Sequence, residues 1–257
     1  GRMTKAIAVI PARFAATRFP GKPLTSLRGR PMVQHVYDRC TEADCFTRVV
    51  VATDSSRIAE ACARHQVDAV MTAANPPSGS DRLAEACVAL GLDGDDIVVN
   101  VQGDEPLIDP AVIDVVAKAL ADAEMSTAAT PIQHAAEYDN PNVVKVVTGA
   151  TGRALYFSRR TIPFLRDPAA QPAAAQLAAF PFLKHLGIYG YRRDALLRLV
   201  QFPPSPLELA ERLEQLRALE NGVKIRVVPV KHVSVGVDTP ADAAAVTPLL
   251  EALLKKK

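Results

Sequence analysis

The sequence lacks the features that mark disulfide-rich, membrane-spanning and nucleic-acid-binding proteins. Its four cysteines, Cys40, Cys45, Cys62 and Cys87, form no C-x-x-C pair, so we expect reduced thiols rather than disulfides or a zinc site. No apolar run approaches the roughly 20 residues that span a bilayer. The formal net charge is only +2, which argues against a nucleic-acid partner. We therefore expect a soluble cytoplasmic protein with neither a membrane nor a nucleic acid as partner.

Several common motifs are also absent. The sequence contains no G-x-x-x-x-G-K-[ST] and no G-x-G-x-x-G, which argues against a P-loop ATPase and a typical dinucleotide-binding enzyme. It contains neither G-x-S-x-G nor H-E-x-x-H, so no candidate for a covalent nucleophile stands out. Any chemistry must therefore come from residues outside these motifs.

The first half of the chain alternates apolar, strand-like segments with helical ones. We expect strands at 6–10, 48–53, 67–71 and 96–101, and helices at 31–43, 55–65, 80–90 and 110–123. N-caps are expected at Asp54 or Ser55, at Ser80 and at Asp109. Strands that are separated by helices predict an α/β fold with a parallel sheet covered on both faces.

The second half has a different pattern. We expect strands at 127–133, 143–148, 153–158, 183–192 and 224–230, some of them antiparallel. A capping box of Ser205 and Glu208 predicts a helix at 206–221, and Thr239 is expected to begin a last helix. Residues 167–181 show no period and are expected to form a surface loop. With no clear linker, residues 1–257 are predicted to form one domain, whose central, mostly parallel sheet contains a smaller inserted antiparallel region.

A basic loop follows the first predicted strand. Arg13, Arg18 and Lys22 lie among prolines and a glycine that prevent a helix. In an open α/β sheet, ligands bind beyond the carboxyl ends of the strands. Arginine can form paired hydrogen bonds with phosphate oxygens, and lysine acts as a point charge. This loop therefore indicates chemistry on a nucleoside triphosphate.

Two aspartates follow predicted strands elsewhere in the chain. Asp104 comes after the strand at 96–101, and Asp238 follows residues 233–237, which are also expected to form a strand. Carboxylates beside a triphosphate would be repelled unless Mg²⁺ bridged them to the phosphates. Each aspartate could instead be an ordinary turn residue. Only the fold can bring the two together.

A weaker signal comes from residues 78–82, Ser-Gly-Ser-Asp-Arg, before a predicted helix. Small residues allow close contact with a base or ribose, and the helix start offers free N–H groups. A simple N-cap explains the segment equally well.

Taken together, the segments of this chain occur in the order typical of one known family. They are IPAR, R-x-PGKPL, ATD, SGSDR, NVQGDEP, NPNVVKVV, ALYFSR, KHLGIYGYR, SPLE, LEQLR and GVDTP. From about residue 6 to residue 245, the chain resembles the 3-deoxy-D-manno-octulosonate (Kdo) cytidylyltransferases, or CMP-Kdo synthetases, a branch of the sugar nucleotidyltransferases. NVQGDEP and GKPL carry the resemblance to the wider group, and HLGIYGYR and LEQLR to the Kdo branch.

The resemblance implies a Rossmann-like nucleotidyltransferase that acts as a homodimer, with a dimerisation and substrate subregion around residues 125–200. It implies CTP and Kdo as substrates, Mg²⁺ as cofactor, and a role in lipopolysaccharide synthesis. Catalytic roles fall on Arg13, Lys22, Asp104 and Asp238, of which the two aspartates would hold the metal. The nucleotide would be bound by Arg13, Arg18, Lys22, Ser78, Gly79 and Arg82. The sugar acid would be bound by Gln102, Arg159, His185, Tyr189, Glu214 and Gln215.

The residues themselves leave alternatives open for the sugar-acid set. The period of two places His185 and Tyr189 on one strand face, which could simply be the wetter face of a strand whose core residues are Leu186 and Ile188. Glu214 and Gln215 could be solvated, and Arg159 could pair with a surface acid, although its guanidinium suits a carboxylate. At the level of function, another sugar acid such as sialic acid, or a nucleotide-binding protein without turnover, remains possible.

Overall fold

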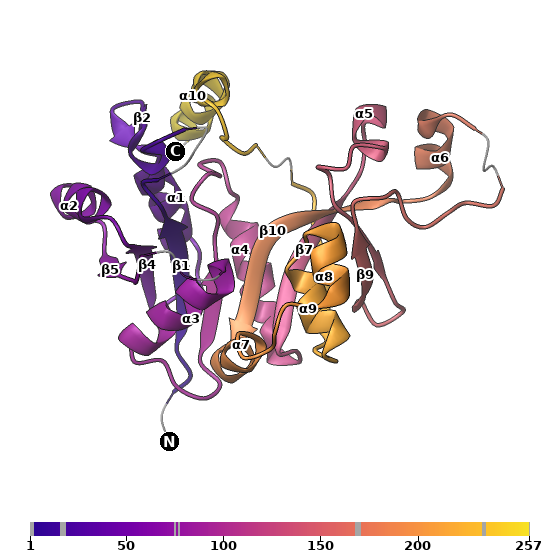
Figure 1. Ribbon diagram of the computed structural model, residues 1–257. Helices are drawn as coiled ribbons and strands as arrows, with labels where there is room; N and C mark the ends of the chain where they lie inside the picture. Colours follow the sequence, from indigo (N-terminus) through magenta and orange to yellow (C-terminus); the bar gives the residue numbers. More distant parts are fainter. Residues whose placement is uncertain are drawn as a thin grey trace.

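The computed structural model describes residues 3–15, 19–74, 76, 78–167, 171–232 and 235–256. Its main feature is a large β-sheet with helices packed on both faces (Figure 1). Among these residues, seven strands form the continuous part of the sheet, in the order β11–β7–β10–β6–β1–β4–β5. In chain order they are Ala6–Ala12 (β1), Arg48–Thr53 (β4), Ala69–Met71 (β5), Ile97–Asn100 (β6), Met125–Pro131 (β7), Leu183–Arg192 (β10) and Ile225–Pro229 (β11).

Six of these seven strands run in the same direction. β1 is parallel to β4 and β6, β4 is parallel to β5, and β7 is parallel to β11. β10 is antiparallel to both of its neighbours, β6 and β7, and also pairs with β8 (Lys145–Thr148). β8 in turn pairs with β9 (Ala154–Ser158). The predicted fold class, a mostly parallel sheet with a smaller antiparallel region, is therefore confirmed.

Alternate side chains of the central strands enter two hydrophobic cores. Ile7 and Val9 of β1 point to one core, and Ala8 and Ile10 to the other. The first core is covered by α3 (Gly79–Ala89), α7 (Arg193–Leu199) and α9 (Gln215–Glu220), and the second by α1 (Met32–Thr41), α2 (Ser56–Arg64) and α4 (Pro110–Lys118). Because both faces are covered, β1 is apolar throughout.

A third, smaller core lies under the helix α10 (Pro240–Lys255). Val246 and Leu250 of α10 pack with Val237, Leu27 and Met32. The remaining short elements are η1 (Lys22–Leu24), β2 (Ser26–Leu27), β3 (Arg30–Pro31) and η2 (Ala119–Ala121). Residues 235–237 form no strand, contrary to the prediction for 233–237, of which 233 and 234 lie outside the described residues. No helix in the described part of the chain is long and apolar enough to cross a membrane.

The antiparallel strands extend into an arm. Figure 1 shows α5 (Ala135–Tyr138), α6 (Ala173–Ala179) and β9 at the end of the molecule away from α2 and β5. The prediction of a loop at 167–181 is wrong where α6 lies, although 168–170 are outside the described residues. Alanines favour the helix, and buried Gln176 anchors it by accepting a hydrogen bond from the Tyr138 hydroxyl at 2.6 Å.

The helix predicted at 206–221 is in fact two helices, α8 (Pro206–Glu211) and α9. Arg212 has a left-handed φ of 54°, which ends α8 and which non-glycine residues rarely adopt. A buried ion pair spans the break, since Arg217 donates to Glu208 from Nε at 2.9 Å and from Nη2 at 2.6 Å. Burial alone would raise the pKa of Glu208, but hydrogen bonds from Arg217 and the Ser205 backbone hold it below its usual range.

The cysteines and most predicted caps agree with expectation. All four cysteines are free, with Cys45 half-buried and the others buried. Burial raises the pKa of Cys45 to about 12, that of Cys62 to about 11 and that of Cys87 to about 12. Side-chain caps form as predicted at Ser55 and Asp109, and capping boxes at Ser205 and Thr239.

The Glu208–Arg217 pair predicts a large effect on stability. Arg217→Met should lower the free energy of unfolding by about 3–5 kcal/mol, because it leaves a buried carboxylate without its cation. The matched control is Arg198→Met, which breaks the exposed Arg198–Glu124 pair and should cost less than about 1 kcal/mol. Urea unfolding measures both values. Equal losses would contradict the role given to the buried pair.

Candidate active site

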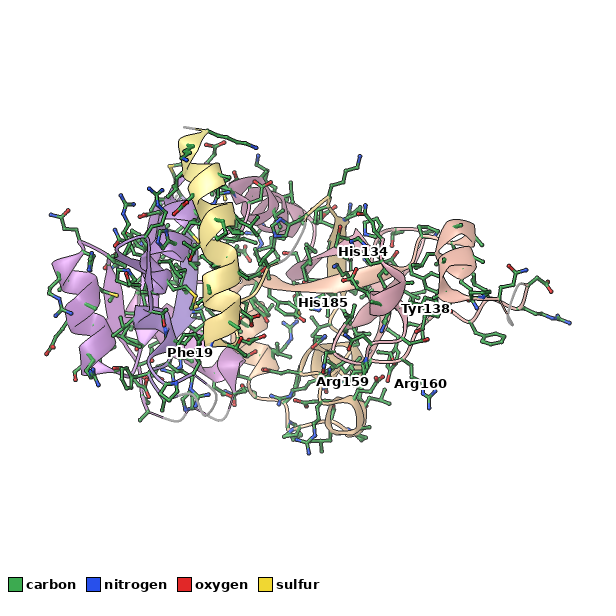
Figure 2. All side chains as sticks on the ribbon, turned by 90° about the horizontal axis from the view of Figure 1, so that it is seen from above. Phe19, His134, Tyr138, Arg159, Arg160 and His185 are labelled. Atoms are coloured by element: carbon green, nitrogen blue, oxygen red, sulfur yellow. The ribbon has the colours of Figure 1, made fainter. Side chains whose placement is uncertain are left out.

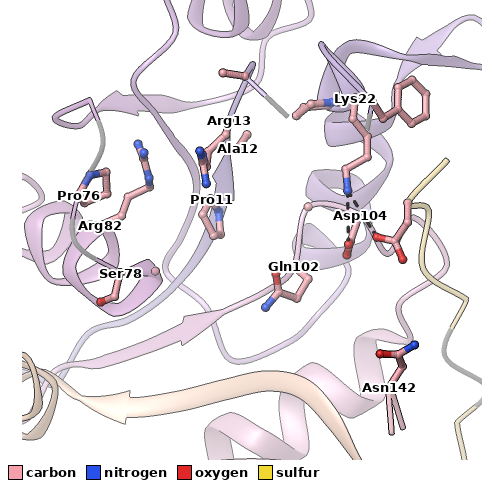
Figure 3. A pocket seen from close by; sticks show the side chains of 16 residues that line it. Pro11, Ala12, Arg13, Lys22, Pro76, Ser78, Arg82, Gln102, Asp104 and Asn142 are labelled. Carbon is pink, nitrogen blue, oxygen red and sulfur yellow. Dashed lines mark ion pairs between the residues drawn. The ribbon is translucent and has the colours of Figure 1, made fainter. Parts of the chain in front are cut away.

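A cavity of about 1070 Å³ opens where β1 and β6 end (Figure 3). Eight of the predicted site residues line it: Arg13, Lys22, Ser78, Gly79, Arg82, Gln102, Asp104 and Asp238. The cavity is also lined by residues with no predicted role, among them Phe19, Pro76 and Asn142. Arg18, predicted to bind the nucleotide, lies outside the described residues.

Gly103 allows the loops after β1 and β6 to meet. A Cβ atom on Gly103 would lie 3.0 Å from the Pro11 carbonyl oxygen and 3.5 Å from Ile10 Cγ2. Only a residue without a side chain fits this approach comfortably, because the nearer contact is with backbone. Glycine therefore places Gln102 and Asp104 directly beside Pro11 and Arg13, which line the same cavity.

Lys22 lies between the two predicted metal ligands. Its Nζ atom is 3.7 Å from Asp104 Oδ2 and 3.7 Å from Asp238 Oδ1. The backbone holds this arrangement, since the Val237 N–H donates to the Asp104 carbonyl at 2.9 Å. The Asp238 N–H in turn donates to Asp242 Oδ2 at 3.0 Å, within the capped first turn of α10. The two aspartates, remote in sequence, are thus brought to one place.

The electrostatics of this cluster favour a further cation. Burial raises the pKa of Asp104 to about 6, Lys22 opposes the shift, and the negative charges of Glu105 and Asp238 add to it. No group of three or more His, Cys, Asp or Glu side chains that could hold a metal occurs in the described part of the chain. Two carboxylates nevertheless suit Mg²⁺, which commonly takes one or two of them and completes its shell with phosphate and water oxygens.

The N-terminus of α3 forms the opposite wall. Ser78, not Ser80 as predicted, caps this helix by accepting from the Asp81 N–H at 3.2 Å. Ser80 lies inside the helix and is buried, where its hydroxyl bonds to Tyr191. Ser78 and Gly79, at the start of this helix, line the cavity, and a helix start carries N–H groups without intrahelical partners.

Arg82 has an unsatisfied hydrogen-bond donor. The side chain is only 2% exposed, and its Nη1 donates to Thr72 Oγ1 at 2.6 Å and lies 3.9 Å from Asp54 Oδ1. Its Nη2 has no hydrogen-bond partner among the described residues. A buried donor without a partner is costly, so a ligand acceptor in the cavity would stabilise it.

Gln102 connects the cavity to β10. Its Nε2 donates to the Gly187 carbonyl at 3.1 Å, and a Cβ on Gly187 would lie 3.7 Å from this amide. Gln102 thus packs against the backbone of Gly187 and is held there by this hydrogen bond. His185 and Tyr189 lie on the same strand on either side of Gly187, as the period of two predicts.

The other predicted sugar-acid residues lie beyond the cavity lining. The His185 ring is 5.2 Å from the Tyr189 ring, and its Nε2 is 2.8 Å from Thr127 Oγ1. Burial lowers the pKa of His185 to about 3, so the imidazole is neutral. Glu214 acts electrostatically on Tyr189, and its buried Oε1 has no partner among the described residues. These three residues form a second polar cluster next to Gln102.

Arg159 and Gln215 occupy different surroundings. Arg159 bonds to backbone rather than to a surface acid: Nε donates to the Glu211 carbonyl at 2.7 Å and Nη1 to the Pro141 carbonyl at 2.9 Å. Gln215 is half-buried at the first position of α9. Figure 2 shows Arg159 and His185 on the side of the molecule that carries the arm, away from the helices at its other end.

Several residues of the site were missed from the sequence. Asp54 lies in the segment ATD and Asn142 in NPNVVKVV; Asp54 was considered only as an alternative N-cap, and neither residue was given a role in the site. Asp54 directly follows the predicted strand at 48–53, as Asp104 and Asp238 follow theirs, so the same signal could have found it. Asn142 carries no charge and follows no predicted strand, so local sequence offered no chemical reason to choose it. Their positions near the cavity depend on contacts with remote segments. Asp54 lies 3.9 Å from Arg82, and Arg159 bonds to Pro141 in the turn that carries Asn142.

Comparison with known proteins agrees with this geometry. The family model described as cytidylyltransferase matches residues 7–225. A protein of Leptothrix cholodnii named 3-deoxy-manno-octulosonate cytidylyltransferase is 54% identical over 242 residues, which cover 91% of this chain and 87% of that protein. One of the same name from Syntrophobacter fumaroxidans is 50% identical over 247 residues, which cover 95% and 96%.

Solved structures lead to the same family. A structure of CMP:2-keto-3-deoxy-manno-octonic acid synthetase complexed with CTP has a TM-score of 0.88 and 40% identity, covering 97% of this chain and 99% of that one. A cytidylyltransferase from Leptospira borgpetersenii, at 17% identity and a TM-score of 0.63, shares the fold, covering 97% and 88%. The chain is thus a member of the cytidylyltransferase family, in the branch of the 3-deoxy-manno-octulosonate cytidylyltransferases.

Proposed function

We propose that this protein transfers CMP from CTP to Kdo and releases pyrophosphate, as a step toward lipopolysaccharide. The observation that carries the proposal is the cavity in which Lys22, Asp104 and Asp238 face the N-terminus of α3. Such a cavity offers cationic and N–H groups for a triphosphate and carboxylates for its metal. Membership of the cytidylyltransferase branch supports the choice of CTP and Kdo.

The residues of the cavity support an in-line displacement. The anomeric hydroxyl oxygen of Kdo forms a bond to the α-phosphorus of CTP, the bond from that phosphorus to the pyrophosphate oxygen breaks, and the hydroxyl proton is released to water. Arg13 and Lys22 bind the phosphates and stabilise the negative charge that grows on the leaving pyrophosphate. Ser78 and Gly79 hold the nucleotide at the start of α3, and Arg82 can give its free Nη2 donor to the nucleotide. Much of the acceleration then comes from holding two substrates side by side.

Mg²⁺ is the proposed cofactor, held by Asp104 and Asp238. When bound, the metal shields the phosphate charge and polarises the α-phosphate. The chain's own part is to keep both carboxylates within reach of one cation, which Gly103 and the Val237–Asp104 hydrogen bond achieve. Lys22 already occupies the space between them, so it can pass from the carboxylates to the phosphates when substrate arrives.

The sugar acid is proposed to lie between Gln102 and β10. Gln102 reaches both the cavity and the Gly187 carbonyl, so it stands at the boundary of the two polar clusters. His185, Tyr189, Glu214 and Gln215 would contact the hydroxyl groups of the sugar, and Arg159 its carboxylate. The buried, unpartnered Oε1 of Glu214 supports this, because it can accept a hydrogen bond from a sugar hydroxyl.

The larger organisation is proposed as follows. Residues 1–257 act as one nucleotidyltransferase domain in the cytoplasm, and the region around 125–200 serves substrate binding and homodimer formation. Exposed apolar side chains on this region, Leu155 and Phe164, support an interface. Light scattering of the purified protein tests the dimer, and a monomer at micromolar concentration would contradict it.

A pyrophosphate-release assay tests the function. We expect release with CTP, Kdo and Mg²⁺ together, and none when either Kdo or Mg²⁺ is omitted. Replacing Kdo by sialic acid or other sugar acids should give much slower release. Faster release with sialic acid would identify a different cytidylyltransferase, and tight CTP binding without release for any acceptor would indicate a protein that has lost turnover.

Asp104→Asn should lower turnover by at least about a hundredfold, because metal stabilisation is worth several kcal/mol. The matched control is Asp122→Asn, an exposed aspartate near Arg226, which should leave turnover unchanged. Both variants should melt close to the parent protein. Near-normal turnover in Asp104→Asn would remove this carboxylate from the mechanism.

The raised pKa of Asp104 predicts a titration near pH 6. In the metal-free protein, its carboxyl carbon should titrate at about pH 6 in ¹³C NMR, and the signal should be assigned by its loss in Asp104→Asn. Below that pH the carboxyl is protonated and cannot bind a metal, so turnover should fall on the acid side. Lys22→Met should raise the titration further, since Lys22 stabilises the charged form. A titration near the ordinary value of 3.8 would contradict the burial of this group.

A further inference from the structure

Lys145 is a buried lysine on β8 for which the proposed mechanism has no use. Its side chain is 0% exposed. Its Nζ donates to the Asn140 carbonyl at 2.8 Å and lies 3.4 Å from the Arg159 carbonyl. Burial lowers its pKa, while Asp139 and Glu137 act in the other direction. Burying an ammonium is costly, and a methionine would fill similar space without that cost, so the two carbonyl contacts call for an explanation.

One of these contacts supports the turn that carries Asn142 to the cavity. The Asn140 carbonyl also accepts from the Val143 N–H at 3.0 Å, and Asn140 Oδ1 accepts from the Asn142 N–H at 2.9 Å. The turn belongs to no helix or strand, so its position depends on such contacts. Figure 3 shows Asn142 at the Asp104 end of the cavity, away from Pro76 and Arg82.

The other contact holds the residue that organises the α8–α9 break. Arg159 Nη1 donates to the Pro141 carbonyl at 2.9 Å, its Nε to the Glu211 carbonyl at 2.7 Å, and its Nη2 to the Arg212 carbonyl at 3.2 Å. Glu214 and Gln215 follow directly after this break. Lys145 therefore links two segments through its carbonyl contacts. One is the Asn140–Asn142 turn, and the other is Arg159, which bonds to the α8–α9 break that precedes Glu214.

We propose that Lys145 is a positioning residue for the acceptor sugar acid, and that it acts by holding Asn142 where its amide contacts the acceptor. This inference rests on the proposed function and deepens it. The acceptor is the substrate concerned, because the phosphate-binding groups Arg13 and Lys22 and the start of α3 have no contact with Lys145 among those described. Asn142 offers both a donor and an acceptor, which suits a polyhydroxylated ligand.

Steady-state pyrophosphate release tests the inference through the KM of each substrate. Lys145→Met and Asn142→Ala should each raise the KM for Kdo at least tenfold and change the KM for CTP less than twofold. The matched control is Arg192→Met. Arg192 is also a cation bound to carbonyls, of Leu120 and Asp95, but it lies at the other end of β10 and should affect neither KM.

The double variant Lys145→Met/Asn142→Ala separates positioning from general loosening. If Lys145 acts through Asn142, the double variant should be no worse for Kdo than the poorer single variant, since interacting sites are not additive. Additive losses, or equal rises in both KM values, would overturn the inference. Asn142 lies on the surface of the cavity, so Asn142→Ala should fold even if Lys145→Met does not. An unchanged KM for Kdo in Asn142→Ala alone would also overturn it.

The result for the unaltered protein distinguishes the two proposals. If it releases pyrophosphate from CTP and Kdo but the variants show no difference between the two KM values, only the positioning role fails. If the unaltered protein and Arg192→Met both release no pyrophosphate with Kdo, the proposed function fails, and the inference about its acceptor fails with it.

Discussion

The active site depends on two close backbone approaches that concentrate negative charge. Gly103 lies against the Pro11 carbonyl, and the Val237 N–H bonds to the Asp104 carbonyl. Together they bring Asp104 and Asp238 to the same lysine, with Glu105 adding its own field. One ammonium group does not neutralise these carboxylates. The pKa of Asp104 is raised by its burial and by repulsion from Glu105 and Asp238. The fold thus concentrates negative charge at a point where the proposed Mg²⁺ would relieve the repulsion.

The antiparallel strand β10 connects the cavity with the second polar cluster. The parallel strands end at the cavity, and β10 runs past them carrying His185 and Tyr189. Gly190 makes this passage possible, because a Cβ atom there would come within 2.5 Å of Ser126 Oγ. The sheet order therefore decides which residues can meet a second substrate beside the nucleotide.

Local patterns in the sequence predicted much of this architecture, because the physics behind them is local. Apolar runs, caps such as Ser55 and Thr239, and glycine or proline boundaries located most of the helices and strands. The failures have tertiary causes. The left-handed Arg212 is stabilised by the Glu208–Arg217 pair across the break, and α6 is anchored by a hydrogen bond between Gln176 and Tyr138, far apart in the chain.

In the candidate site, too, most residues with a local sequence signal were predicted, and residues placed by contacts between remote segments were not. Arg13, Lys22, Asp104 and Asp238 were noticed as charged residues after predicted strands, the family resemblance implied their catalytic roles, and the structure brings all four to one cavity. Asn142 and Lys145 could not be found in this way. Lys145 bonds to a backbone carbonyl and Asn142 lines the cavity, and neither arrangement can be recognised from the residue type alone. Their roles follow only from the turn at Asn140 and from the reach of Arg159.

The suppressed acidity of the cysteines has a practical consequence. Thiolates are the reactive form of cysteine, and burial keeps the pKa values of Cys45, Cys62 and Cys87 well above neutral pH. Maleimide reagents should therefore modify the native protein slowly. A single cysteine introduced at an exposed position of the arm, such as Ala178 of α6, would carry a fluorophore selectively, and its emission could report motion of the arm during turnover.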